Sequence, residues 1–222
     1  MLKRLGPLVA LALLVFATEA RASLFVNPSF ETGDFTGWIT SDLTNSLPLS
    51  VFNSYPDPFI VSPSWIPTDG EFAAFSGFDG ESPGVISIAQ DIVLPSGSTT
   101  LLFDYRAAWN LFLASQDRLF NVVVQPSGGG SDLLTQTILT VQAQTANDTF
   151  YQTGSVDLSA YGGQSIRVLF ELLVPESFTG PAQFELDNLR VEAVPEPATL
   201  LLLGSGLAVA GARRLRKRRT QP

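Results

Sequence analysis

Between residues 23 and 194, glycine, proline, asparagine, aspartate and serine divide the chain into short apolar runs. The runs are rich in β-branched and aromatic residues, which favour strands, and they contain no amphipathic helix of three turns. Alternation is clearest in SIRVLFELLV, where Ile166, Val168 and Phe170 share one face. About ten short strands with regular turns are typical of one antiparallel β-sandwich.

The expected strands are Leu24–Phe30, Leu49–Asn53, Glu71–Phe75, Val85–Val93, Thr100–Arg106, Leu119–Gln125, Leu133–Val141, Phe150–Asp157, Ser165–Val174 and Ala182–Glu192. Two segments interrupt this rhythm. Residues 43–69 contain five prolines, which predicts a surface excursion around one edge strand. Residues 126–131, PSGGGS, predict a flexible hairpin connection. Neither divides the body, so we expect one domain over residues 23–194.

The body is strongly acidic. It holds four arginines (Arg106, Arg118, Arg167 and Arg190) and no lysine against nineteen acids, which gives a net charge of −15. Such a surface repels phosphates, so nucleic acid is excluded as a partner. It suits divalent cations and neutral or basic partners.

The chain contains no cysteine and no histidine. Catalytic sites of the Ser-His-Asp or Cys-His kind need an imidazole base, and zinc sites draw mostly on histidine and cysteine. These classes of site are therefore excluded.

The first 22 residues have the three parts of a secretory signal peptide. Lys3 and Arg4 supply the charged region, Leu8–Ala17 form the apolar stretch, and Ala20-Arg21-Ala22 is the expected cleavage site. We therefore expect an exported protein.

Near the other end, Ala198–Ala212 form an uncharged run of 15 residues followed by the cluster RRLRKRR. As a helix this run would span about 22 Å, short of the roughly 30 Å hydrocarbon core, and the arginines can extend its reach by snorkelling. A transmembrane stop with a cytoplasmic basic end is the expectation.

Membrane physics does not explain Pro195-Glu196-Pro197, which precedes the run. The order of this motif, an apolar helix and an Arg-rich end resembles the PEP-CTERM sorting signal of Gram-negative bacteria, over residues 195–219. The resemblance implies exosortase as a partner, a transient stay in the inner membrane, and a final place on the cell surface or in the matrix. It also implies an association with exopolysaccharide and biofilm, and it does not specify the activity of the body.

The body resembles the jelly-roll sandwich of carbohydrate-binding modules. The similarity lies in LFVNPSFETGDFTGW at its start, ISIAQDIVLPSGSTTLLFDYRA in its middle and AQFELDNLRVEAV at its end. A jelly-roll-like, all-β sandwich is the implied fold, which does not by itself specify a function.

Such modules often carry a structural calcium ion between the first and last strands. The matching positions are Glu31, in NPSFE, and Asp187, in FELDNL. Calcium takes six to eight oxygen ligands, and the acidic body offers many. The apolar residues change parity at Asp187-Asn188, which predicts a bulge there. The alternative is that both acids accept backbone N–H groups in turns.

Aromatic side chains suggest a glycan platform, because sugar rings stack on them. Trp38 is expected in the core. Tyr55, Trp65 and Trp109 are the candidates for exposed rings, although the two tryptophans could instead cap an end of the sandwich.

An enzyme built from this chain would have to use paired carboxylates, as glycosidases do. Glu71, Glu171 and Glu185 lie in expected strands and could pair across a sheet. No motif singles out such a pair, so the expected role is that of a non-catalytic surface or matrix protein. A glycan-binding module and a glycoside hydrolase are the alternatives.

Overall fold

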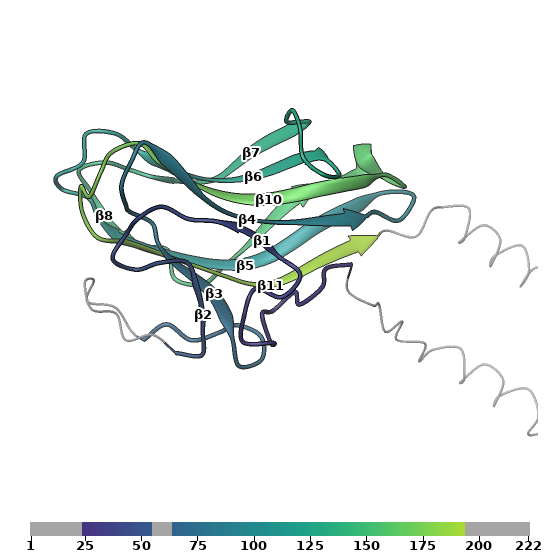
Figure 1. Ribbon diagram of the computed structural model, residues 1–222, viewed down its shortest axis with the longest axis horizontal. Coiled ribbons are helices and arrows are strands. Elements are labelled where there is room, and N and C mark those ends of the chain that lie inside the picture. The colour runs from purple at the N-terminus through teal and green to yellow at the C-terminus, as the bar shows by residue number, and fades with distance from the viewer. Residues whose placement is uncertain (1–23, 55–63, 194–222) are drawn as a thin grey trace, which may run out of the picture.

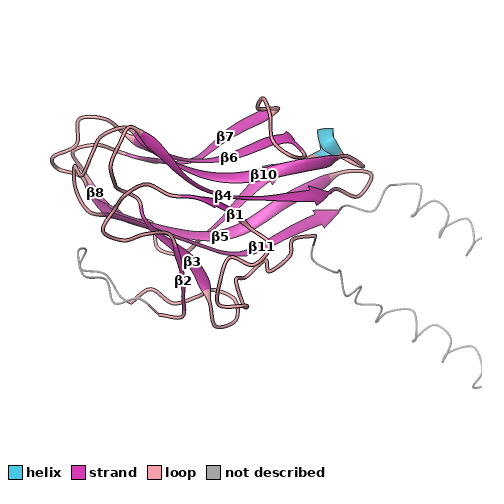
Figure 2. Ribbon diagram, viewed as in Figure 1, coloured by secondary structure: helices cyan, strands magenta, loops and turns pink. Residues whose placement is uncertain are grey.

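The computed structural model describes residues 24–54 and 64–193. Two antiparallel sheets face each other (Figure 1). Their facing side chains form an apolar core. Strands and loops make up almost all of the described part, and its one helical turn is the 3-10 element η1, Ser159–Tyr161 (Figure 2). The expected all-β, antiparallel sandwich is confirmed.

The first sheet has five strands, in the order β1 (Ile39–Ser41), β4 (Gly84–Val93), β10 (Ser165–Val174), β6 (Arg118–Pro126) and β7 (Leu134–Val141). The second has six strands. Its main order is β2 (Ser50–Phe52), β3 (Ala73–Gly77), β11 (Ala182–Ala193), β5 (Thr99–Asn110) and β8 (Ala146–Asp148), and β9 (Gln152–Asp157) also pairs with β5.

The period-2 pattern of the sequence explains which side chains enter the core. In β10 the residues Ile166, Val168 and Phe170 are buried, as the alternation predicts, and the residues between them are less buried. Across the core, Phe103 of β5 lies edge-on against Phe170, with ring centroids 5.1 Å apart. The sandwich is therefore held together by side chains that the two sheets contribute alternately.

Strand β11 contains the expected bulge. Its register against β5 shifts between Asp187 and Arg190, and Asn188 adopts a left-handed backbone conformation with φ of 53°. The extra residue resets the alternation, so Leu186 before the bulge and Leu189 after it both face the core. Parity in the sequence was a sufficient signal for this feature.

The expected strand Leu24–Phe30 is wrong, because this segment forms bends and turns. Asn27 and Phe30 have φ values of 53° and 57°, which no strand can accommodate. The side chain of Gln90 instead pairs with the segment as a neighbouring strand would. It accepts a hydrogen bond from the N–H of Val26 at 2.6 Å and donates to the Val26 carbonyl at 3.0 Å.

The proline-rich excursion surrounds an edge strand, as expected, since β2 lies at the margin of its sheet. Its later residues pack on the outer face of that sheet. Trp65 is fully buried there against Phe75 of β3, with ring centroids 5.8 Å apart. This part of the excursion therefore covers the sheet.

Several predictions from the sequence fall outside residues 24–54 and 64–193: the signal peptide, Tyr55, and the sorting segment with its apolar helix. Within those described ranges, no helix has the length and apolar character needed to cross a membrane.

Replacing Gln90 with leucine should loosen the N-terminal segment, because the change removes both hydrogen bonds to Val26. The expected local cost is about 1–3 kcal/mol. Amide hydrogen exchange should show faster exchange at Val26, while amides in the centre of β10 keep their protection. Unchanged exchange at Val26 would contradict this role of Gln90.

Candidate functional site

Loops gather at the end of the sandwich where β11 begins, opposite the end where it finishes (Figure 1). We call this the loop end, and it comprises residues 42–47, 78–83, 111–117 and 175–181. Backbone hydrogen bonds join these segments. The N–H of Glu81 donates to the carbonyl of Thr44 at 2.8 Å, and that of Phe178 donates to Gly80 at 3.2 Å.

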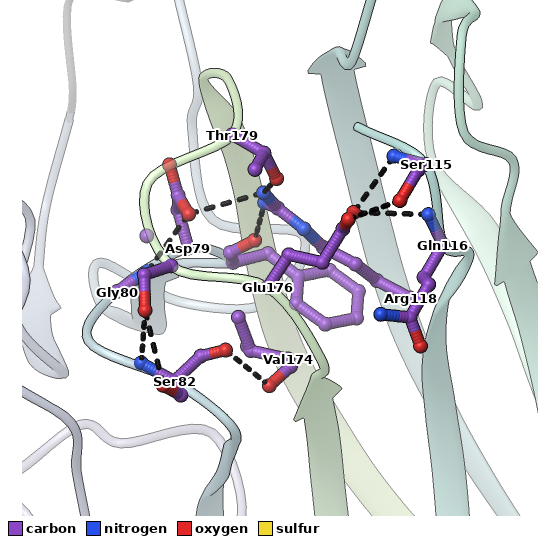
Figure 3. Close-up of polar contacts among 12 residues, drawn as sticks. Asp79, Gly80, Ser82, Ser115, Gln116, Arg118, Val174, Glu176 and Thr179 are labelled. Carbon is purple, nitrogen blue, oxygen red and sulfur yellow. Dashed lines mark hydrogen bonds and ion pairs between the residues drawn. The ribbon is translucent and has the colours of Figure 1, made fainter. Parts of the chain in front are cut away.

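Arg118, the first residue of β6, is the central connection of the loop end (Figure 3). Its side chain is fully buried. The guanidinium donates to the carbonyl of Phe78, to Asp79 Oδ1 at 3.0 Å, and to Thr179 Oγ1 at 3.0 Å. One side chain thus fixes the β3–β4 loop relative to the β10–β11 loop.

A second acid holds the remaining loop (Figure 3). Glu176 accepts hydrogen bonds from the backbone N–H groups of Ser115 and Gln116, at 2.8 and 2.9 Å, and from the Ser115 hydroxyl. These donors lower the pKa of Glu176, led by the Ser115 hydroxyl, so the carboxylate stays ionised at neutral pH.

Burial opposes charge on both members of the Arg118–Asp79 pair. Burial raises the pKa of Asp79. The charge of Arg118 and the hydrogen bonds that Asp79 accepts lower this pKa and so offset part of the rise. Burial also lowers the pKa of Arg118, although the negative charges of Asp79 and Glu176 act in the opposite direction and raise it. Such a pair contributes little net stability, but removing one partner leaves the other charge buried and uncompensated.

Beside this pair, a pocket of about 260 Å³ opens between the 45–47 turn and residues 178–182. Asp79 and the exposed ring of Phe178 line it, together with small and apolar groups. Sequence reasoning missed Asp79, Arg118 and Phe178. The available signal was weak: Arg118 is one of four arginines in the body, and it opens a largely apolar strand.

The two residues expected to bind calcium do meet at one loop. The backbone N–H and the hydroxyl of Thr68 donate to Asp187 Oδ2, at 2.7 and 2.9 Å, and the N–H of Phe72 donates to Glu31 Oε1 at 2.9 Å. Both carboxylates therefore hold the 68–72 loop by hydrogen bonds, which is the alternative that the sequence left open.

No group of three or more His, Cys, Asp or Glu side chains is placed to hold a metal within residues 24–54 and 64–193. The carboxylates of Glu31 and Asp187 face N–H and O–H donors, whereas calcium needs a cage of oxygen acceptors. The calcium ion stays a prediction. Melting with and without a chelator tests it, because only a bound ion makes the transition sensitive to chelation.

The tryptophans expected to be exposed are buried. Trp65 has no exposed surface and Trp109 is 4 % exposed, so neither ring offers a face to a glycan. Trp109 points into the core, and its Nε1–H donates to Thr145 Oγ1 at 2.9 Å. Trp38 is buried as expected. Trp109 belongs to the main core, whereas Trp65 covers the outer face of the second sheet and does not cap an end of the sandwich.

Under Trp65, the outer face of the second sheet carries buried charges. Arg106 of β5 is 1 % exposed; its guanidinium lies 4.4 Å from the Trp65 ring centroid and 2.7 Å from Asp148 Oδ2. Glu185 of β11 lies opposite Arg106 in the ladder and is equally buried. Its Oε1 has no hydrogen-bond partner, and its Oε2 lies 3.5 Å from the Tyr151 hydroxyl.

Burial raises the pKa of Glu185 to about 8, with a further contribution from the charge of Asp187. Burial likewise raises the pKa of Asp187 to about 6. Glu185 is therefore mostly protonated at neutral pH, which makes its burial tolerable.

The three glutamates considered for catalysis do not form a pair across a sheet. Glu171 and Glu185 belong to different sheets, and the ladder places Glu171 opposite Asn121 of β6. Glu71 lies in the loop before β3, where its N–H donates to Glu31. The described residues thus provide no positive indication of catalysis.

Residues 193–218 match the PEP-CTERM protein-sorting motif. The C-terminal segment is a PEP-CTERM sorting signal. The resemblance noted from Pro195-Glu196-Pro197 is confirmed. A PEP-CTERM signal implies export, a transient membrane anchor and processing by exosortase.

None of the curated proteins matches the sequence. Ahead of the PEP-CTERM signal, the body is similar to several solved structures. One is a family-61 carbohydrate-binding module in complex with β-1,4-galactotriose (16 % identity, TM-score 0.49, covering 78 % of this chain and 100 % of that chain). Another is a cleaved adhesin domain of Lys-gingipain from Porphyromonas gingivalis (15 % identity, TM-score 0.46, 78 % and 100 %).

A third is a family-28 module specific for non-crystalline cellulose (15 % identity, TM-score 0.47, covering 76 % of this chain and 94 % of that chain). These similarities describe the arrangement of strands.

Replacing Arg118 with alanine should destabilise the fold by about 3–5 kcal/mol, because Asp79 would be left half-buried without its cation. Urea denaturation measures the change. Arg167→Ala is the matched control: its ion pair with Asp91 is partly exposed, with 18 % and 38 % of the two side chains accessible, and should contribute at most about 1 kcal/mol. Equal effects of the two variants would contradict this assignment.

Stability should fall as pH rises from about 6 to about 8. In this interval the folded chain retains the proton of Glu185, whereas the unfolded chain, with an ordinary glutamate pKa, has lost it. No histidine titrates in the same range. The free energy of unfolding should decrease by up to about 1.4 kcal/mol per pH unit.

Denaturation at several pH values measures this slope. Glu185→Gln should flatten it and should stabilise the protein at pH 8. Glu192→Gln, a change at an exposed residue of the same strand, should keep the wild-type slope. A slope that survives in Glu185→Gln would assign the titration to another group.

Proposed function

We propose that this protein is a non-catalytic component of the cell surface or extracellular matrix of a Gram-negative bacterium. Exosortase processes it at the C-terminal signal, and the released sandwich contacts exopolysaccharide within the biofilm. The sorting motif at residues 193–218 carries the proposal.

The chemistry of the body supports a binding role. It has no cysteine or histidine for nucleophilic or imidazole catalysis, and the candidate glutamates are separated by the fold. A lysine-free, acidic body also stays soluble outside the cell and avoids nucleic acid. A neutral polysaccharide remains a compatible partner.

The sorting step is testable in a host that carries an exosortase. A tagged wild-type chain should yield a shortened product outside the cell. Deleting the exosortase, or replacing Glu196 with alanine, should leave the full-length chain in the membrane fraction. Glu192→Ala, which changes an exposed acid ahead of the motif, should be processed normally. Full-length protein in the cytosol, or processing without exosortase, would refute the proposal.

A further inference from the structure

The pocket at the loop end has rigid walls. On one side, Asp42 Oδ1 accepts from the Asn45 amide at 3.1 Å, and its Oδ2 accepts from the Leu49 N–H at 2.8 Å, which fixes the turn between them. On the other side, buried Arg118 holds both Asp79 and Thr179. A ligand therefore meets preformed walls, and little conformational entropy is lost in ordering them.

Phe178 supplies an apolar face at the rim. It is 56 % exposed and has a φ of 48°, a left-handed conformation that is uncommon for an aromatic residue. Its N–H donates to the Gly80 carbonyl at 3.2 Å, which anchors the backbone below the ring. An aromatic ring that is presented to solvent from an anchored backbone can stack against the face of a ligand.

The charges of the pocket select for a neutral ligand. Asp79 is the ionisable side chain among the lining residues, and it is already paired with Arg118, which lies behind it. No cation lines the pocket to attract an anion, and the acidic body opposes one. Because the charge of Arg118 offsets the carboxylate charge of Asp79, a cationic ligand would gain little electrostatic attraction in the pocket.

The remaining groups select for hydroxyls. Asp79 offers acceptor oxygens, and the exposed Ser46 offers a hydroxyl that can donate and accept. The volume of about 260 Å³ lies just below the roughly 300–1,000 Å³ typical of pockets for drug-sized ligands. The pocket therefore has room for one or two small rings.

We propose that this pocket binds a neutral sugar ring, with the ring face on Phe178 and hydroxyl groups on Asp79 and Ser46. The inference rests on the proposed function, since it assigns the contact with extracellular polysaccharide to a specific place. It replaces Trp65 and Trp109, which are buried, as the expected sugar contacts.

The test uses the full chain purified in mild detergent and probed on an array of neutral oligosaccharides, with uronic-acid oligosaccharides as the charged comparison. The strongest neutral binder is then measured by calorimetry. Phe178→Ala should weaken its binding about tenfold or more, and Ser46→Trp should abolish it by filling the pocket. Phe112→Ala is the matched control, because Phe112 is a 63 % exposed phenylalanine of the neighbouring loop that does not line the pocket.

Thermal melting must show that each variant remains folded. The inference stands if the two pocket variants lose binding and the Phe112 variant retains it. It is overturned if all three bind as the wild type does, if only charged oligosaccharides bind, or if the folded wild-type chain binds no member of the array. Sorting is measured separately by localisation, so loss of sugar binding leaves that result intact, and a sorting failure leaves the binding data intact.

Discussion

Strand β11 imposes the constraint on which both sheets depend. Successive side chains of β11 lie on opposite faces of the sheet. Phe184 and Leu186 pack in the core, whereas Glu185 and Asp187 lie on the outer face. If all twelve residues of β11 alternated strictly, the apolar side chains after Asp187 would face outward, away from the core. The bulge prevents this, and the carboxylate of Asp187 stabilises it by accepting the N–H of Asn188 at 2.7 Å.

Buried charge in this protein positions segments more than it stabilises the fold. Arg118 and Arg106 are each almost fully buried, and each connects a strand to a segment distant in sequence. Replacing such groups with apolar residues of equal volume is often neutral for stability, so their role is to specify one arrangement of loops. At the loop end this arrangement forms the walls of the pocket.

The sequence was informative where local rules decide the structure. Alternation placed Ile166, Val168 and Phe170 correctly, and parity placed the bulge in β11. The sequence was misleading where a residue distant in the chain determines the local structure. The run Leu24–Phe30 has strand-like residues, but the side chain of Gln90 supplies the hydrogen bonds of a partner strand.

The same limit applies to the site. Trp65 stands among prolines, a context typical of surface loops, yet its ring fits against Phe75 in another segment. Phe178 looked like an ordinary loop residue, since the pocket exists only where the 42–47 and 175–181 segments converge. No local pattern in the sequence indicates that convergence. The sorting signal, in contrast, is local, and it was recognised from a motif, an apolar run and a basic cluster that follow one another in the sequence.

The ladder between β5 and β11 separates the pocket from the sorting signal. Ala193, where the signal begins, lies beside Thr99, and Ala182, at the pocket, lies beside Trp109. The intervening strand spans about 36 Å. The pocket and the start of the sorting signal therefore lie at opposite ends of this strand. Because residues 193–218 include none of the residues that line the pocket, removal of the signal would leave the proposed sugar site whole.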